Sequence, residues 1–573
     1  MAVLQPILDL AELLYQHGVR HAVISPGSRS APITLAFVRH GGFQIETAID
    51  ERSGGFIGLG IAQQTMQSVV LICTSGSAVY NYAPAVAEAY FQQIPLIAIS
   101  ADRPQEWIHQ FDGQTIFQNN IFGKHVKQFY QLPVDFVHED SSWAHNRLVN
   151  EAYCMSQSLP RGPVHINIGI REPFYPENNE VFQYHSSVRK IEIVPNQKVL
   201  NTTEWHQILN EWDRFDRKLV AVGQLVNPND KLDSLQKLSS EYDIPVVADV
   251  ISNIPWNENV IRNHDFFLSD PKAVSLEPQL LITVGMSFIS KELKTFIRKN
   301  PPLQHWHISE DGLVIDPFKT LTKIIPISPE YFFDQLLEKT DFQLFTENEE
   351  PENFTEYLAE WQAVSLKTSA YSSLFLENLT TINDVLLLDS IFKYLQSDFK
   401  LQLGNSMTVR YANVIGSLNR NVWVNCNRGT SGIDGCLSTA IGAAKVSKLP
   451  VYLILGDVSF LYDRNGLLQN SLPSNLKIII LNNDGGNIFS MIEGPANLPE
   501  NGVYFKTEHG RNAKLVASDA GVKYFSVHEL KDLDAILQEF VSHSHCSILE
   551  LFTDSQENSK TWLGIKAYVK GNL

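Results

Sequence analysis

Apolar residues in this chain recur as short runs that are bounded by turn residues and separated by amphipathic segments. A helix is predicted over residues 6–17, and the apolar runs that follow it lie at residues 21–24, 69–73, 96–100 and 164–168. Strand-like runs that alternate with helical segments are typical of a parallel sheet wrapped by helices. The N-terminal third of the chain is therefore predicted to form an α/β domain.

The same alternation returns twice. The second block of apolar runs lies at residues 219–222, 245–248 and 280–284, and the third at residues 401–403, 451–455, 477–481 and 547–552. A proline-rich stretch at 172–197 and an acidic stretch at 346–356 separate the blocks and are interpreted as linkers. A chain of 573 residues is too long for one core. We expect three α/β domains at residues 1–180, 198–345 and 357–573, each a mostly parallel sheet flanked by helices.

Polar residues follow two neighbouring runs of the third block. Gly456 and Asp457 come after residues 451–455, and Asn482 and Asn483 come after residues 477–481, with Gly485 close behind. In an open parallel sheet, ligands bind at such strand ends. A carboxylate, a side-chain amide and a backbone carbonyl suit a hard divalent cation that takes further ligands from phosphate. Either turn alone is equally well explained as a polar cap, but the pair predicts a metal and diphosphate site.

Strand ends of the first block carry candidate anion-binding groups. Ser28 and Arg29 lie in a Pro-Gly turn that opens a helix, Ser75 and Gly76 open another, and Arg103 and Gln114 follow the run at 96–100. Free amides at a helix start attract anions, and a guanidinium matches a carboxylate. An ordinary capped turn, or pairing of Arg103 with Asp102 or another acid, is the alternative for each feature alone.

Glu51 stands immediately before a helix that is rich in glycine and alanine. A helix with so few side-chain atoms allows another backbone to approach closely, as in a tight subunit interface. A second small-residue helix is predicted over residues 437–444. A lone glutamate is usually a solvated surface residue, so Glu51 alone is a weak signal.

Composition argues against nucleic-acid binding and membrane insertion. The formal net charge of −18 gives no basis for binding nucleic acid, which requires a basic surface. No apolar run approaches membrane-spanning length, and the N-terminus lacks the features of a signal peptide. Five cysteines without metal-ligand spacing suit a reducing compartment. We therefore expect a cytoplasmic protein with no membrane insertion.

The Gly-Asp and Asn-Asn pair resembles the diphosphate-binding motif of thiamine diphosphate (ThDP) enzymes. Val458 and Ser459 stand where most of that superfamily has a second glycine, which points to a subgroup. The segments at residues 24–32, 74–78, 101–104, 428–435 and 456–459 together resemble the 2-succinyl-5-enolpyruvyl-6-hydroxy-3-cyclohexene-1-carboxylate (SEPHCHC) synthase family, the ThDP enzymes of menaquinone biosynthesis.

The resemblance implies the ThDP-enzyme fold, with a pyrimidine-binding, a central and a diphosphate-binding domain. It implies ThDP and Mg²⁺ (or Mn²⁺) as cofactors and a homodimer or homotetramer whose active sites lie between subunits. The implied reaction is decarboxylation of 2-oxoglutarate, followed by 1,4-addition of the resulting cofactor-bound carbanion to isochorismate.

The resemblance also implies residue roles. Glu51 is the expected catalytic residue, which hydrogen-bonds the aminopyrimidine ring of the cofactor. The expected metal ligands are Asp457, Asn483 and the Gly485 carbonyl, and further cofactor contacts are Ser75, Gly76, Ile433 and Ser459. The expected substrate contacts are Ser28, Arg29, Arg103, Gln114, Lys291, Ser406, Arg410, Arg428, Ile488 and Phe489. Lys291 is followed by Glu292, where the family often has arginine, so a shifted alignment at this lysine stays open.

Two alternatives stay open, one within the ThDP enzymes and one from another class. Another ThDP-dependent 2-oxo acid decarboxylase or carboligase, such as an acetohydroxyacid synthase, would share Glu51 and the metal motif, but a pyruvate-type substrate has one carboxylate and does not need four arginines. A non-catalytic α/β nucleotide-binding protein would use glycine-rich turns only for binding, and Glu51 together with both halves of the metal motif disfavours it.

Overall fold

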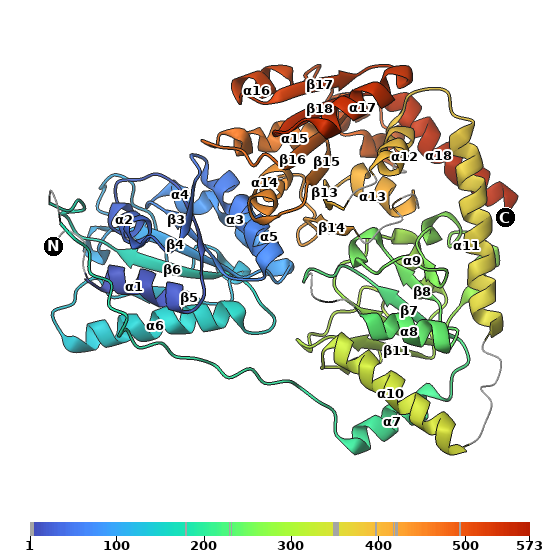
Figure 1. Cartoon of the computed structure of the whole chain (residues 1–573), viewed down its shortest axis with the longest axis horizontal. Helices are drawn as coiled ribbons and strands as arrows, with labels where there is room; N and C mark the ends of the chain where they lie inside the picture. The colour runs from blue at the N-terminus through green and yellow to red at the C-terminus, as the bar shows by residue number, and fades with distance from the viewer. Residues whose placement is uncertain are drawn as a thin grey trace.

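The computed structural model describes residues 5–177, 180–227, 230, 232–347, 355–395, 398–415, 418, 422–491 and 494–573, without the side chains of 341–347 and 355. Three six-stranded sheets, each flanked by helices, follow one another along the chain (Figure 1). Neighbouring strands run parallel in each sheet. The predicted class of three α/β units with parallel sheets is confirmed.

The first sheet has the strand order β2-β1-β3-β4-β6-β5. Its strands are β1 (His21–Ile24), β2 (Gln44–Thr47), β3 (Val69–Cys73), β4 (Leu96–Asp102), β5 (Phe129–Leu132) and β6 (Val164–Gly169). Its helices are α1 (Gln5–Gln16), α2 (Ala31–His40), α3 (Glu51–Thr65), α4 (Ser77–Asn81), α5 (Ala83–Phe91) and α6 (Glu139–Gln157). The four predicted strands are present, and the two strands that sequence reasoning missed form the two edges.

The central sheet is ordered β12-β11-β10-β7-β8-β9, which is a doubly wound arrangement. Its strands are β7 (Lys218–Val222), β8 (Val246–Ala248), β9 (Val260–Ile261), β10 (Leu280–Val284), β11 (Gln304–Ile308) and β12 (Lys323–Ile325). Its helices are α7 (Thr202–Trp212), α8 (Asp233–Glu241), α9 (Lys291–Lys299) and α10 (Pro329–Glu347). The linker predicted at 172–197 has no helix or strand in its described residues. Most of the acidic linker predicted at 346–356 lies outside the described residues.

The third sheet is ordered β14-β13-β15-β16-β18-β17. Its strands are β13 (Lys400–Leu403), β14 (Trp423–Cys426), β15 (Val451–Gly456), β16 (Leu476–Asn482), β17 (Lys523–Val527) and β18 (Ser547–Phe552). Its helices are α12 (Asp384–Tyr394), α13 (Met407–Val414), α14 (Cys436–Val446), α15 (Asp457–Asp463), α16 (Lys514–Asp519), α17 (Leu533–Ser542) and α18 (Ser555–Asn572). The long helix α11 (Thr355–Glu377) precedes them and runs beside both the central and the third unit (Figure 1).

The two small-residue helices pack against each other. A Cβ on Gly60 of α3 would collide with the Thr439 carbonyl of α14, and one on Gly442 of α14 would collide with the Ile57 carbonyl of α3. The close backbone approach predicted for α3 is therefore real. In this chain its partner is α14 of the third unit, whereas sequence reasoning assigned the helix to a subunit interface.

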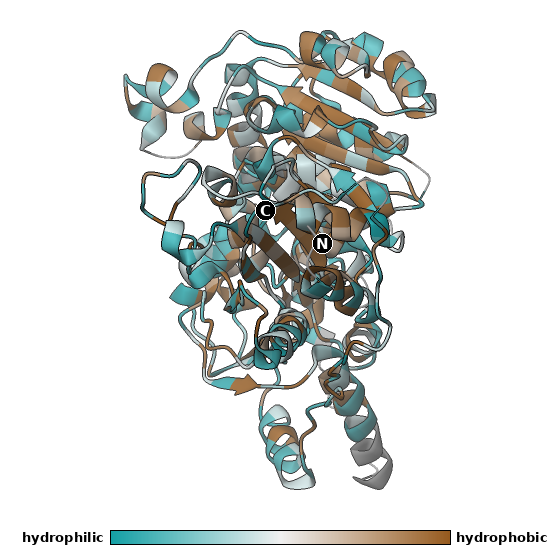
Figure 2. Ribbon diagram, turned by 90° about the vertical axis from the view of Figure 1, so that its left-hand side faces the viewer, coloured by the Kyte–Doolittle hydropathy of each residue, from teal (hydrophilic) through white to brown (hydrophobic). Residues whose placement is uncertain are grey.

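The apolar strands form the interior, and Figure 2 shows them largely in brown beneath more hydrophilic helices. One continuous hydrophobic cluster joins α3 and β3 of the first unit to α14 and β15 of the third. All five cysteines are free thiols. Among the described helices, none combines the length and the apolar character that crossing a bilayer requires.

Candidate active site

The three predicted metal ligands meet at one sheet edge. Strands β15 and β16 are parallel neighbours, with Gly456 beside Leu481, so the residues that follow them emerge together. Asp457 begins α15, and its Oδ2 accepts a hydrogen bond from the Gly485 amide at 2.9 Å. Asn483 lies two residues before Gly485. The loops after two separate strands thus form a single site.

The atoms at this site fit a divalent cation. The Asn483 amide group donates from Nδ2 to Asp384 Oδ2 at 2.9 Å, whereas its Oδ1 is buried without a hydrogen-bond donor among the described residues. A buried acceptor without a partner costs about 1–3 kcal/mol, and a cation would satisfy it. One carboxylate, one amide oxygen and one carbonyl match the oxygen ligands of a hard metal. The described residues contain no cluster of three His, Cys, Asp or Glu side chains that could hold a metal, so a mixed donor set is the one available.

Asp384, at the start of α12, is a site residue that sequence reasoning missed. Its Oδ2 fixes the Asn483 amide, and its Oδ1 accepts a hydrogen bond from Thr553 Oγ1 at 2.7 Å. Burial raises the Asp384 pKa to about 6, and the hydrogen bonds from Thr553 and Asn483 act in the opposite direction. No local motif identifies this residue, because it precedes Asn483 by 99 positions.

His509 also reaches the metal-ligand cluster. Its Nε2 lies 3.1 Å from Asp457 Oδ2, and this hydrogen bond raises the His509 pKa. The Asp484 carboxylate accepts hydrogen bonds from the amides of His509 and Gly510, at 3.0 and 2.6 Å. The segment that carries His509 therefore packs directly over the loop after β16. Sequence reasoning did not connect this segment with the site.

Glu51 is the first residue of α3, and its Oε2 accepts a hydrogen bond from Asn81 Nδ2 at 3.3 Å. The preceding residue, Asp50, caps the helix by accepting from the Arg52 amide at 2.9 Å. Arg52 also donates to the Tyr462 carbonyl in α15, at 2.9 Å. The helix that presents Glu51 thus abuts the end of α15, whose first residue is the predicted metal ligand Asp457.

The predicted cofactor contacts of the first unit cluster around Gly76. Gly76 has a φ of 84°, which favours glycine, and its amide donates to Gln118 Oε1 at 3.0 Å. A Cβ at this position would lie 3.4 Å from the Gln114 Cα, so the structure brings Gln114 beside the turn. The Ser75 hydroxyl is buried without a described partner. Gln118 is a further site candidate that the sequence did not reveal.

Ile433 and Ser459 are joined directly. The Ser459 hydroxyl donates to the Ile433 carbonyl at 2.6 Å. Ser459 lies two residues after Asp457 in α15, and Ile433 precedes α14. This bond ties a predicted cofactor contact, Ile433, to the helix that begins with the predicted metal ligand Asp457.

Arg29 and Arg103 line one cavity of about 380 Å³. Arg29 donates to the Ile170 carbonyl at 2.8 Å, and its guanidinium lies 4.4 Å from the centre of the Phe174 ring. Arg103 Nε pairs with Asp112 at 2.5 Å, so the acid that pairs with its side chain is Asp112 and not Asp102. Ser28, beside Arg29, bonds the Tyr175 hydroxyl at 3.1 Å. One face of the first unit therefore presents two of the predicted arginines together.

Arg410 and Arg428 lie within electrostatic range of each other in the third unit. Burial lowers the Arg410 pKa, and the charge of Arg428 lowers it further. Arg428 donates to Asn405 Oδ1 at 3.1 Å, but its Nε is buried without a described partner. Arg410 donates to the carbonyl of Ser406, a serine held at a φ of 69°. Two guanidinium groups within electrostatic range of each other, one of them with a buried donor that has no described partner, suit an anionic group.

The remaining predicted substrate contacts differ in exposure and in position. Lys291 opens α9 and is exposed. Lys294, one turn later, is half-buried, and its pKa is lowered mainly by burial and also by the charge of Arg428. Lys294 is therefore the lysine within electrostatic range of the arginine pair. Ile488 and Phe489 are half-buried in the turn at Asn487–Ser490, directly after the metal loop.

Comparison with protein families places the two parts of the candidate site, in the first and third units, in two cofactor-binding domains. Residues 9–127 match the N-terminal TPP binding domain of thiamine pyrophosphate enzymes, and residues 405–551 match their C-terminal TPP binding domain. Residues 189–367 match the middle domain of thiamine pyrophosphate enzymes. Thiamine pyrophosphate is another name for thiamine diphosphate. Glu51 lies in the first of these regions, and Asp457, Asn483 and Gly485 lie in the last.

Similar proteins cover nearly the whole chain. A 2-succinyl-5-enolpyruvyl-6-hydroxy-3-cyclohexene-1-carboxylate synthase of Cytophaga hutchinsonii is 41% identical over 571 residues, which is 99% of each chain. Proteins of the same name from Flavobacterium johnsoniae and Bacteroides fragilis are each 36% identical, over 96% and 97% of both chains respectively.

Proposed function

The chain belongs to the SEPHCHC synthase family of ThDP enzymes, and we propose that it decarboxylates 2-oxoglutarate and adds the remaining four-carbon unit to isochorismate in a 1,4 fashion. The products are SEPHCHC and carbon dioxide, a step of menaquinone biosynthesis. The observation that carries this choice is that Arg29 and Arg103 line one cavity while Arg428 keeps a buried Nε without a described partner, which together provide more positive charge than a substrate with a single carboxylate requires.

The proposed metal and cofactor roles rest on two buried polar atoms that have no described hydrogen-bond partner. They are Ser75 Oγ in the first unit and Asn483 Oδ1 in the third. Asp457, Asn483 and the Gly485 carbonyl would hold Mg²⁺ (or Mn²⁺) against the diphosphate, with Asp384 fixing the Asn483 amide. Ser75, Gly76, Ile433 and Ser459 would contact the organic part of the cofactor. When bound, ThDP supplies the electron sink for decarboxylation. Glu51 would hydrogen-bond a ring nitrogen of the cofactor's aminopyrimidine and so hold a proton at that nitrogen.

The substrates carry several carboxylates, and the protein has a net charge of −18, so the binding cations must be local. Arg29, Arg103, Arg410 and Arg428 provide four forked donors, and Ser28, Gln114, Ser406 and Lys291 or Lys294 add further polar contacts. Ile488 and Phe489 would form an apolar wall of the substrate pocket. Because Arg103 pairs with Asp112, a substrate carboxylate must either displace Asp112 or share the Arg103 guanidinium with it.

The assembly and domain roles extend this proposal. Residues 1–180, 198–345 and 357–573 would be the pyrimidine-binding, central and diphosphate-binding domains of a homodimer or homotetramer with active sites between subunits. Exposed aromatic side chains support a second copy at the first domain, since Trp107, Phe111 and Phe117 all face solvent in the single chain. Five free thiols support a cytoplasmic enzyme.

The reaction is tested with purified protein, ThDP, Mg²⁺ and 2-oxoglutarate, with and without isochorismate, by following carbon dioxide release and SEPHCHC. We expect SEPHCHC only when both substrates are present. The matched control is Glu51→Gln, which should bind ThDP and remain folded but lose turnover. Consumption of pyruvate in place of 2-oxoglutarate, or failure of the wild-type protein to bind ThDP, would refute the proposal.

A further inference from the structure

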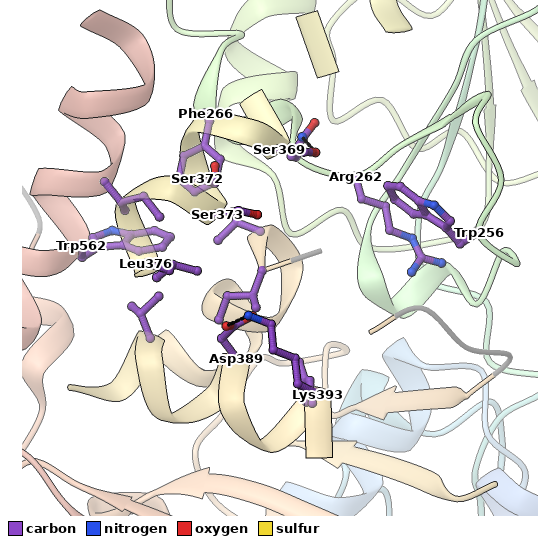
Figure 3. Close-up of a pocket in the computed structure, with 16 residues that line it drawn as sticks. Trp256, Arg262, Phe266, Ser369, Ser372, Ser373, Leu376, Asp389, Lys393 and Trp562 are labelled. Atoms are coloured by element: carbon purple, nitrogen blue, oxygen red, sulfur yellow. Dashed lines mark hydrogen bonds and ion pairs between the residues drawn. The ribbon is translucent and has the colours of Figure 1, made fainter. Parts of the chain in front are cut away.

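A second cavity, of about 430 Å³, lies away from the arginine pair, between the central and third units (Figure 3). It is bounded by α11, α12, α18, the C-terminal end of α13 and the central-unit segment at residues 256–266. Val414 and Ile415 at the end of helix α13 line the cavity, whereas Arg410, one turn earlier in the same helix, does not. Cavities of this size accommodate small organic ligands.

Arg262 forms the charged part of the wall. Its side chain is only 9% exposed, and Figure 3 shows it extending beside the ring of Trp256. Its two terminal nitrogens donate to the carbonyls of Ile254 and Leu418, and its Nε is buried without a described partner. No described carboxylate lies within ion-pair distance of this guanidinium. Asp389, the acid that lines the cavity, is paired with Lys393 at 2.6 Å.

A buried guanidinium without a counter-ion is unusual, because buried charges in proteins are normally paired. Burial alone lowers the Arg262 pKa to about 10, so the group stays protonated at neutral pH. The two carbonyls offer partial charge but no neutralisation. The position of the charge at a cavity wall leaves room for an anion that enters from solution.

The remaining wall is mostly apolar. Phe266, Leu376, Phe392 and Trp562 contribute rings and aliphatic side chains to it. One face of α11 adds the hydroxyl groups of Ser369, Ser372 and Ser373, which Figure 3 shows on the same side of the cavity as Trp562. The cavity thus combines one cationic group with a large apolar surface and a few hydroxyl groups. This combination matches a ligand with an apolar body and a single acidic group.

We propose that this cavity is a binding site for a small apolar monocarboxylate, whose carboxylate pairs with Arg262 and whose body contacts Phe266, Leu376 and Trp562. Neither Arg410 nor Arg428 lines this cavity. The pairing supplies the counter-ion that Arg262 lacks, through guanidinium hydrogens that the two backbone carbonyls leave unused.

The probes are 4-tert-butylbenzoate, cyclohexanecarboxylate and benzoate, titrated into the full-length protein by calorimetry. The neutral analogue 4-tert-butylbenzamide tests the charge. We expect saturable binding of at least one carboxylate, and at least about tenfold weaker binding of the amide analogue. Arg262→Met should weaken carboxylate binding by at least about tenfold, because it retains an apolar side chain but removes the charge.

Two further variants separate the cavity from other anion sites. Leu376→Trp fills the cavity without changing its charge and should also weaken binding, whereas Arg428→Ala removes a substrate arginine and should leave probe binding unchanged. Thermal melting shows whether each variant is folded. The proposal is wrong if none of the three carboxylates binds the wild-type protein, if folded Arg262→Met and folded Leu376→Trp bind as well as wild type, or if Arg428→Ala abolishes the binding.

Discussion

The Glu88 carboxylate of α5 accepts a hydrogen bond from the amide of Thr430, 2.6 Å away in the third unit. The same carboxylate accepts from the Gly429 amide at 2.8 Å and from the Thr430 hydroxyl. Glu88 is only 1% exposed, so water cannot replace these bonds. The two amides directly follow Arg428. An acid of the first unit thus holds in place the loop that presents Arg428, a predicted substrate contact of the third.

We expect Glu88→Gln to impair substrate use more than cofactor binding. A glutamine has one acceptor oxygen in place of two, so at least one loop amide loses its partner and Arg428 loses its fixed position. The specificity constant kcat/KM for isochorismate should fall by about tenfold or more, with ThDP affinity within about twofold of wild type. Glu529→Gln, at an exposed acid paired with Lys531, is the control. An equal loss of substrate use and ThDP affinity would show that Glu88 only stabilises the fold.

Asp384→Ala should weaken the binding of ThDP and Mg²⁺ together. Without Asp384 Oδ2, the Asn483 amide is free to rotate and no longer presents Oδ1 to the metal. Loss of a residue that orients a metal ligand typically costs about 10–100-fold in metal affinity. A Mg²⁺ titration at fixed ThDP measures this effect. Thr553→Val removes only the bond to Asp384 Oδ1 and should have a smaller effect, so equal effects of both variants would contradict this role.

Arg428→Ala should leave a folded protein that binds ThDP but uses its substrates poorly. We expect kcat/KM to fall by about 100-fold, which corresponds to the loss of a charge-assisted hydrogen bond to a carboxylate. Arg428→Lys should recover part of this loss, because it restores the charge without the fork. Steady-state kinetics with each substrate, together with ThDP titration, check this expectation. If ThDP affinity falls by the same factor, Arg428 is a structural residue.

Gly442→Ala should destabilise the contact between α3 and α14. The added Cβ collides with the Ile57 carbonyl, a backbone atom that cannot move without shifting α3. Overpacking of this kind costs about 1–3 kcal/mol in the free energy of unfolding. Gly571→Ala in α18 is the control, since its Cβ would meet nothing within 4 Å, and alanine is the better helix former. Denaturant unfolding of both variants measures the difference.

The buried carboxyl group of Asp463 should make stability depend on pH. Burial raises its pKa to about 7, while hydrogen bonds from Ser438 and the charge of Arg52 act in the opposite direction and Asp434 acts in the same one. Between the unfolded pKa, near 3.8, and the folded pKa, near 7, the folded protein binds a proton that the unfolded chain has released. Folding is therefore favoured less as pH rises through this window, and the full penalty is present above it.

Asp463→Asn removes this titration while keeping polar atoms beside Ser438. Relative to this variant, the wild-type protein should lose about 3 kcal/mol of unfolding free energy between pH 5 and pH 8. Chemical denaturation of both proteins at a series of pH values gives the comparison. A wild-type minus variant difference that does not change with pH would show that Asp463 stays ionised in the folded protein.

Sequence patterns predicted the interior of the fold better than its edges. Strands such as β3 and β10 are fully buried and read as continuous apolar runs, so their bounds are those expected. The edge strand β2 has partly exposed residues and lacks an apolar run, and β9 is only two residues long. Their strand conformation comes from pairing with a neighbour, which no local pattern encodes.

The residues of the candidate site also differ in whether the sequence could predict them. The sequence could predict that Asp457, Asn483 and Gly485 lie together, because each follows a buried strand within a few residues. Asp384 and Glu88 were missed because their partners, Asn483 and Thr430, lie 99 and 342 positions away. Only the packing of separate units brings such pairs together. The Arg103 partner, Asp112, was among the alternatives that the sequence left open as another acid.

The first and third sheets have the same strand order when their strands are counted from the start of each unit. Helices α3 and α14 occupy the same place in that order, after the second strand of each unit, and they are the two helices that pack together. The first and third units therefore repeat one topology and differ in the residues at their strand ends. The third unit carries there an acid and an amide that suit a metal, whereas the first carries Glu51.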